Sequence, residues 1–146
     1  MKNYTTKIPA KQTVGEITDL LTEHDAVRIT INNNESRNPK AITFTLIIEE
    51  KEVGFLLEAN VDATYRAMVA DKKVTKAHKN KEQAERTAWR TLKEYLHIKL
   101  DYIAIEQDKE ARMFKMQEEF FAKMITPNNQ TVFQFFKSNS QLLLNQ

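Results

Sequence analysis

The chain has 146 residues, no cysteine and a net charge of +2 at pH 7. This length suits one ordinary domain, and the lack of cysteine excludes disulfide bonds, cysteine-ligated zinc and thiol chemistry. No apolar run approaches the roughly 20 residues that span a bilayer, and the first residues lack the apolar core of a secretory signal. We therefore expect a protein of the cytoplasm that does not enter a membrane.

The charged residues are segregated along the chain. Residues 66–93 carry nine basic and three acidic side chains, whereas residues 16–62 carry ten acidic and four basic ones. Two such stretches indicate either a surface for an anionic partner or two parts of the chain that face each other.

The first part of the chain predicts one helix and three strands. A capping-box pattern at Thr13 and Glu16 predicts the start of a helix with one apolar face. Three runs then alternate apolar with polar residues, at residues 27–31, 42–48 and 53–59, as half-buried strands do. Polar segments separate the runs, so we expect an antiparallel meander.

The middle of the chain predicts two helices joined by a basic loop. Residues 61–70 predict a short helix, and a lysine-rich loop follows at residues 71–80. A stretch without Gly or Pro begins at Lys81, and its apolar stripe predicts one long helix to about residue 107. Trp89 lies on or beside this stripe, so we expect it in the core rather than stacked on a base.

The last part of the chain is rich in Met and Phe. Residues 113–125 predict an amphipathic segment, and residues 131–144 predict a final short helix or a docked tail. The segment either covers Ile47 and Leu56, which fall on the second face of the sheet, or serves as a surface for a partner or for self-association.

These elements together predict an α+β fold. An N-terminal helix and a three-stranded antiparallel meander are followed by a short helix and by a long helix packed on the sheet, with C-terminal helices after it. We assign residues 1–106 to a core domain and residues 107–146 to a helical extension packed on that core.

The sequence shows no catalytic constellation. Gly15 and Gly54 are the only glycines, which excludes a glycine-rich phosphate loop, and the three histidines, His24, His78 and His97, lie far apart without metal-ligand spacing. We expect no enzyme activity, no metal and no cofactor. The alternative is an active site assembled from residues scattered through the fold.

The basic loop and the first turns of the long helix form the candidate nucleic-acid site. Basic side chains spaced along a loop and a helix N-terminus can meet successive phosphates. The alternative is a solvated polar surface without a partner. The site consists of Lys72, Lys73, Lys76, Lys79, Lys81, Arg86 and Arg90.

The order of elements resembles the double-stranded-RNA-binding domain, whose second helix opens with lysines much as KNKEQAERTAWRTL does here. That resemblance implies binding through shape and phosphate contacts. The three strands followed by a helix also resemble the core of phage single-strand annealing proteins.

Most of the chain is similar to a group of uncharacterised proteins from phages, prophages and gut-bacterial mobile elements. The segments that carry this resemblance are YTTKIPAKQTVGEI, AITFTL, EQAERTAWRTLKEYLHIKLDYI, EEFFAKMI and TVFQFF. The resemblance implies a mobile-element setting in a bacterial cell, and no mechanism.

We therefore expect a small, non-catalytic accessory protein of a phage or mobile element that binds DNA or RNA. One alternative is a protein-interaction module, such as an anti-CRISPR-like inhibitor of a host nuclease complex. Another is an accessory to single-strand annealing or recombination. The expected partner is nucleic acid or a host nucleoprotein complex, and the Met- and Phe-rich segment is a candidate surface for a homo-oligomer.

Overall fold

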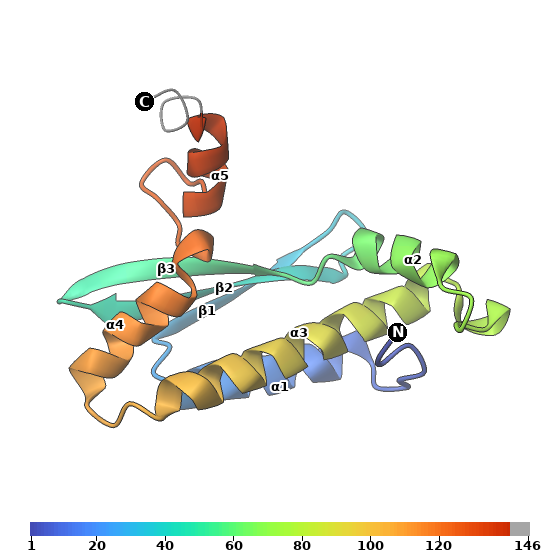
Figure 1. Ribbon diagram of the computed structural model, residues 1–146, viewed down its shortest axis with the longest axis horizontal. Helices are drawn as coiled ribbons and strands as arrows, with labels where there is room; N and C mark the ends of the chain where they lie inside the picture. The colour runs from blue at the N-terminus through green and yellow to red at the C-terminus, as the bar shows by residue number, and fades with distance from the viewer. Residues whose placement is uncertain (141–146) are drawn as a thin grey trace.

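The computed structural model describes residues 1–140 and shows the predicted α+β order. Helices α1 and α3 lie beside each other under one face of a sheet, α4 crosses near one end of it, and α5 stands away from the body (Figure 1). The helices and strands are α1 (Ala10–Glu23), β1 (Arg28–Asn33), β2 (Pro39–Ile48), β3 (Lys51–Glu58), α2 (Val61–Ala70), α3 (Lys81–Ala104), α4 (Lys109–Glu119) and α5 (Val132–Ser138), with short 3-10 turns η1 (Lys76–His78) and η2 (Phe121–Lys123).

The three strands form the predicted antiparallel meander, in the order β1-β2-β3. Phe44 at the centre of β2 lies opposite Ile29 of β1 and Phe55 of β3, so these three side chains share one face. Since side chains alternate between the faces of a strand, Leu46 points to the same side, where α1 and α3 cover the sheet.

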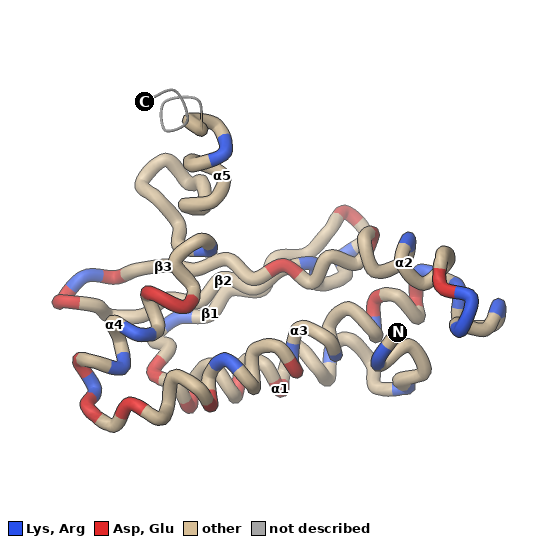
Figure 2. The backbone as a smooth tube through the Cα atoms, in the orientation of Figure 1, with Lys and Arg blue, Asp and Glu red and all other residues tan. Residues whose placement is uncertain are grey.

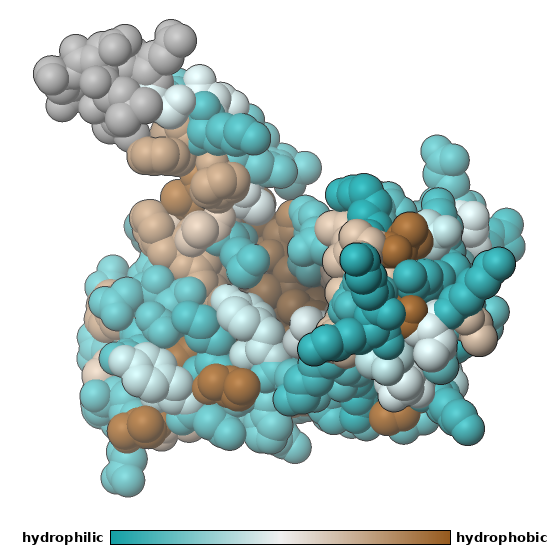
Figure 3. Space-filling model, turned by 45° about the vertical axis from the view of Figure 1, so that its right-hand side comes forward, coloured by the Kyte–Doolittle hydropathy of each residue, from teal (hydrophilic) through white to brown (hydrophobic). Residues whose placement is uncertain are grey.

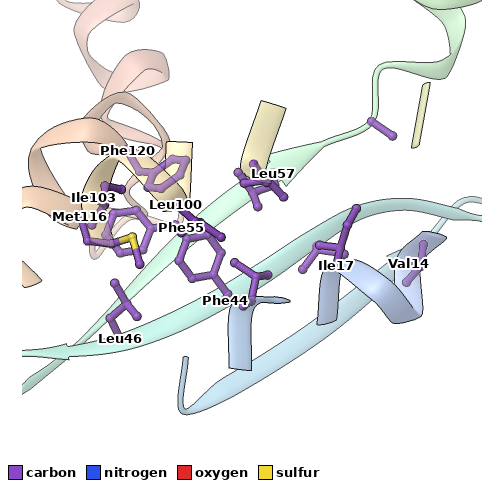
Figure 4. Close-up of a cluster of buried hydrophobic side chains, with 14 of the residues drawn as sticks. Val14, Ile17, Phe44, Leu46, Phe55, Leu57, Leu100, Ile103, Met116 and Phe120 are labelled. Carbon is purple, nitrogen blue, oxygen red and sulfur yellow. The ribbon is translucent and has the colours of Figure 1, made fainter. Parts of the chain in front are cut away.

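Aromatic rings join the C-terminal part of the chain to this core (Figure 4). The rings of Phe44 and Phe55 stack with centroids 5.1 Å apart. Phe120, which follows α4, meets them edge-on, with its centroid 5.9 Å from that of Phe44 and 6.4 Å from that of Phe55. Such arrangements stabilise beyond the burial of area alone.

Trp89 is the predicted anchor of the long helix. Its side chain is fully buried, and its indole Nε1–H donates to the carbonyl oxygen of Pro39 at 3.1 Å. This bond ties the middle of α3 to the first residue of β2. The prediction that Trp89 belongs to the core is therefore confirmed.

The predicted start of the first helix is wrong by four residues. Helix α1 begins at Ala10 and has Pro9 at its N-cap without a side-chain cap. Thr13 lies inside the helix, where its buried hydroxyl accepts from Arg90 of α3. Glu16 also faces α3, so contacts between helices replace the local capping box that the sequence suggested.

The C-terminal segment packs mainly on a different face of the sheet from the one expected, and only Ile125 lies against Gly54 on the expected face. Met113, Met116 and Phe120 pack on the face that α1 and α3 also cover. Ile47 on the other face remains 42% exposed, so the expected cover for Ile47 is absent. The segment instead extends the edge of β3, where the backbone N–H of Ile125 donates to the Gly54 carbonyl oxygen at 2.8 Å.

Within the described residues, the final helix is not docked on the core. Helix α5 ends at Ser138 and packs against η2. Residues 141–144 of the expected helix lie outside the described residues.

The long helix α3 ends at Ala104, three residues before the expected end.

Candidate nucleic-acid interface

The basic loop between α2 and α3 is fixed at three points. Val74 is buried beside Met68 and Ala84 in a small second core. The carboxylate of Asp71 accepts from the backbone N–H of Lys73 at 2.9 Å and from the N-terminal amino group at 3.0 Å. These two hydrogen bonds hold the pKa of Asp71 below its usual range, and the bond from the Lys73 backbone has the larger effect. The loop thus presents its lysines from a constrained backbone.

The third fixed point is the start of α3. The side-chain oxygen of Asn80 accepts from the backbone N–H of Gln83 at 2.8 Å, which caps the helix. Gln83 in turn donates to the carbonyl oxygens of Tyr4 and Thr6, at 2.7 and 2.9 Å. The N-terminal segment is thereby held against the first turn of α3.

The lysines of the loop differ in how they are engaged. Lys79 is half-buried and donates to the carbonyl oxygen of Val69 at 3.1 Å. The other four are exposed, and within residues 1–140 no carboxylate lies at ion-pair distance from any of them. Figure 2 shows the basic positions gathered at this end of the molecule. We call these four residues the lysine cluster: Lys72, Lys73, Lys76 and Lys81.

The two arginines of the predicted site bind carboxylates of the protein. Arg86 is half-buried and contacts Glu82 at 3.0 Å, and its guanidinium also donates to the side-chain oxygen of Gln83. Arg90 lies 2.6 Å from Glu16 of α1, which Lys93 also approaches at 3.4 Å. These contacts place Arg86 and Arg90 in the packing of α3 rather than beside the lysine cluster.

The Arg90–Glu16 pair also shows that part of the acidic stretch faces part of the basic stretch. The hydrogen bond from Arg90 is the main cause that holds the pKa of Glu16 below its usual range, and burial opposes it. Since the folded-state pKa is the lower one, ionised Glu16 stabilises the fold above the ordinary carboxyl pKa. This stabilisation disappears as the pH falls through the folded-state pKa.

We expect Glu16→Gln to lower the free energy of unfolding by about 1 kcal/mol near pH 7, a value that allows for solvent screening of a partly exposed pair. The difference from the wild type should close as the pH falls through the lowered pKa of folded Glu16, because the wild-type carboxyl is then also neutral. Urea unfolding, followed by circular dichroism from about pH 7 to about pH 3, measures the free energy of unfolding of both proteins. Glu23→Gln, at an exposed position of the same helix, is the matched control. A pH-independent difference would contradict this role of Glu16.

A groove lies next to the lysine cluster, and no sequence pattern predicts it. It has a volume of about 1260 Å³ and runs between the β1–β2 hairpin tip, the start of α2 and the first turns of α3. Burial, and then the charge of Glu82, raise the pKa of Glu85 in its wall. Four carboxylates and three basic groups line the groove, so its charge does not favour phosphates. The acidic residues are Glu58, Asp62, Glu82 and Glu85, and the basic ones are Lys40, Arg66 and Lys81.

The histidines make local contacts. The ring nitrogen Nδ1 of His24 lies 2.9 Å from the Leu20 carbonyl oxygen, and that of His78 lies 2.7 Å from the Thr75 hydroxyl. His97 lies beside Asp101 on α3. Across the part of the chain that the structure describes, no three histidine or acidic residues are grouped as metal ligands. Nor does any described helix combine the length and apolarity needed to cross a membrane.

Comparison with protein-family models, with curated proteins and with solved structures finds no match for this chain. The class that the structure defines is an α+β protein, with a helix, an antiparallel meander and further helices in that order.

Proposed function

We propose that this protein binds nucleic acid through the lysine cluster, without catalysis. The observation that carries the proposal is the set of four exposed lysines, three on a constrained loop and Lys81 at the start of α3, none of them held by a carboxylate of the described chain. Lysine contacts to phosphate supply affinity that depends little on sequence. The expected ligand is therefore the backbone of DNA or RNA rather than one base sequence.

The proposed site is narrower than the seven residues that the sequence suggested. Arg86 and Arg90 already bind carboxylates, and freeing Arg90 would leave the half-buried Glu16 without its partner. The neighbouring groove carries more acidic than basic groups, so the phosphates would cross the outer side of the loop. Trp89 and its buried ring take no part in stacking.

Binding should therefore weaken steeply with salt. Four phosphate contacts predict a slope of about −3.6 for log affinity against log salt, or a loss of about 100-fold between about 50 and about 200 mM salt. Fluorescence anisotropy with labelled single-stranded and double-stranded oligonucleotides, in DNA and RNA form, measures this slope.

A quadruple variant tests the site itself. Replacing Lys72, Lys73, Lys76 and Lys81 by glutamine should abolish the salt-dependent binding. The matched control replaces Lys11, Arg37, Lys51 and Lys109 by glutamine, which removes the same charge from exposed positions elsewhere. No binding of any probe at low salt, or an equal loss in the control, would overturn the proposal.

A further inference from the structure

The C-terminal arm, residues 125–140, carries an uncovered apolar surface. Within it a backbone bridge pairs Ile125 with Thr131, and Thr131 forms a capping box with Gln134 at the start of α5. The three phenylalanines of α5 are nevertheless 48–57% exposed, namely Phe133, Phe135 and Phe136. Figure 3 shows the apolar side chains of this arm projecting from the body.

An arm of this kind needs a partner surface. A helix of seven residues is too short to be stable in water by itself, and helices of this size depend on packing of their apolar side. Clustered exposed aromatic side chains are typical of interaction sites rather than of ordinary protein surface.

The hairpin groove described above has the size of such a helix. Seven helical residues are about 10 Å long and about 10–12 Å across, which occupies on the order of 1,000 Å³. The groove, at about 1260 Å³, exceeds most small-molecule sites. Its wall includes Ile31, which points to the core side of the sheet, opposite Ile42, and is still 47% exposed.

The charges of the two surfaces are complementary. The groove carries one more acidic than basic group, and Lys137 is the single charged residue of α5. Burial, and then the charge of Glu82, raise the pKa of Glu85, so a positive charge beside this carboxylate would favour its ionised form. A lysine brought into the groove would supply such a charge.

We propose that the C-terminal arm of one copy docks into the hairpin groove of a second copy, and that the exchange is reciprocal. Helix α5 stands off the sheet and apart from α2, and it packs against η2, so a chain does not fill its own groove (Figure 1). Two reciprocal contacts close a two-fold dimer. Lys81 belongs both to the lysine cluster and to the groove lining, so the dimer is tested by variants of the arm and of Ile31, which leave the four lysines unchanged.

Sedimentation equilibrium up to about 200 μM protein tests the dimer by mass action. The wild type should dimerise with rising concentration. An arm variant, Phe133→Ser with Phe136→Ser, and a groove variant, Ile31→Glu, should each raise the dimer dissociation constant about 100-fold. Phe114→Ser, at an exposed position of α4 outside the arm, is the control and should leave it unchanged.

Mixing the two variants separates loss of contact from loss of folding. The arm variant keeps an intact groove, and the groove variant keeps an intact arm, so one of the two contacts can form between them. The equimolar mixture should therefore give a heterodimer that neither variant gives alone. Any of three results would overturn the proposal: a monomeric wild type, a groove variant that dimerises normally, or a mixture without heterodimer. With a monomeric wild type, the arm would be a surface for a different protein.

Discussion

Replacing Trp89 by alanine should lower the free energy of unfolding by about 3–5 kcal/mol, as large-to-small changes of buried aromatic residues do. The indole is fully buried and belongs to the main core, so its removal leaves a cavity between α3 and the start of β2. The Pro39 carbonyl oxygen also loses its indole donor. Since domains are stable by only about 5–15 kcal/mol, this single change should remove a large part of the stability.

Two further variants separate the components of this effect. Trp89→Phe retains much of the ring volume and loses the hydrogen bond. We therefore expect it to lower the free energy of unfolding by about 1–2 kcal/mol. Ile98→Ala removes an apolar side chain that is 73% exposed on the same helix, and should cost no more than about 0.5 kcal/mol. Urea unfolding followed by far-ultraviolet circular dichroism measures all three. A loss for Trp89→Ala no larger than that for Ile98→Ala would show that the ring does not anchor the helix.

The elements that the sequence predicts well are those with a strong local period. The alternation around Phe44 and Phe55 defines β2 and β3, and the stripe through Trp89 defines α3, because burial of one face requires that spacing. Helix α2 (Val61–Ala70) has the bounds that the sequence indicated.

Partners that lie far apart in sequence could not be predicted in this way. Arg90 and Arg86 looked like one basic ridge, yet Arg90 pairs with Glu16, 74 residues away. The same pairing explains why the capping box at Thr13 failed: a contact with α3 outweighs a local bond worth about 1 kcal/mol. A charge pattern gives the sign of a surface, whereas tertiary packing decides which charges stay free.

The groove is a stronger case of the same limitation. Its walls come from the hairpin tip, the end of β3, and the starts of α2 and α3, and each of these segments reads locally as an ordinary polar loop or helix start. The exposure of α5 could not be predicted from the sequence either. A Phe-rich helix has the same pattern whether it packs on its own core or on another molecule. The groove and the exposed side of α5 are therefore recognised only from the three-dimensional structure.

Phe120→Ala is the second change with a large expected effect. It should lower the free energy of unfolding by about 3–5 kcal/mol. Phe120 is buried where α4 ends, and its ring meets both Phe44 and Phe55 edge-on. Removing the ring weakens the contact that holds α4 and η2 on the sheet, while α1 and α3 keep their own packing. We therefore expect local opening of the C-terminal part as well as lower overall stability.

The neighbouring residue provides the matched control for this prediction. Phe121 is 51% exposed, so Phe121→Ala should change the unfolding free energy by no more than about 0.5 kcal/mol. Limited trypsin digestion reports the local opening, because Lys115 and Lys123 lie on either side of Phe120 and are cleaved faster when that region opens. If both variants lost stability equally, or if cleavage at these lysines did not accelerate in Phe120→Ala, the ring would not be what holds the C-terminal helices on the sheet.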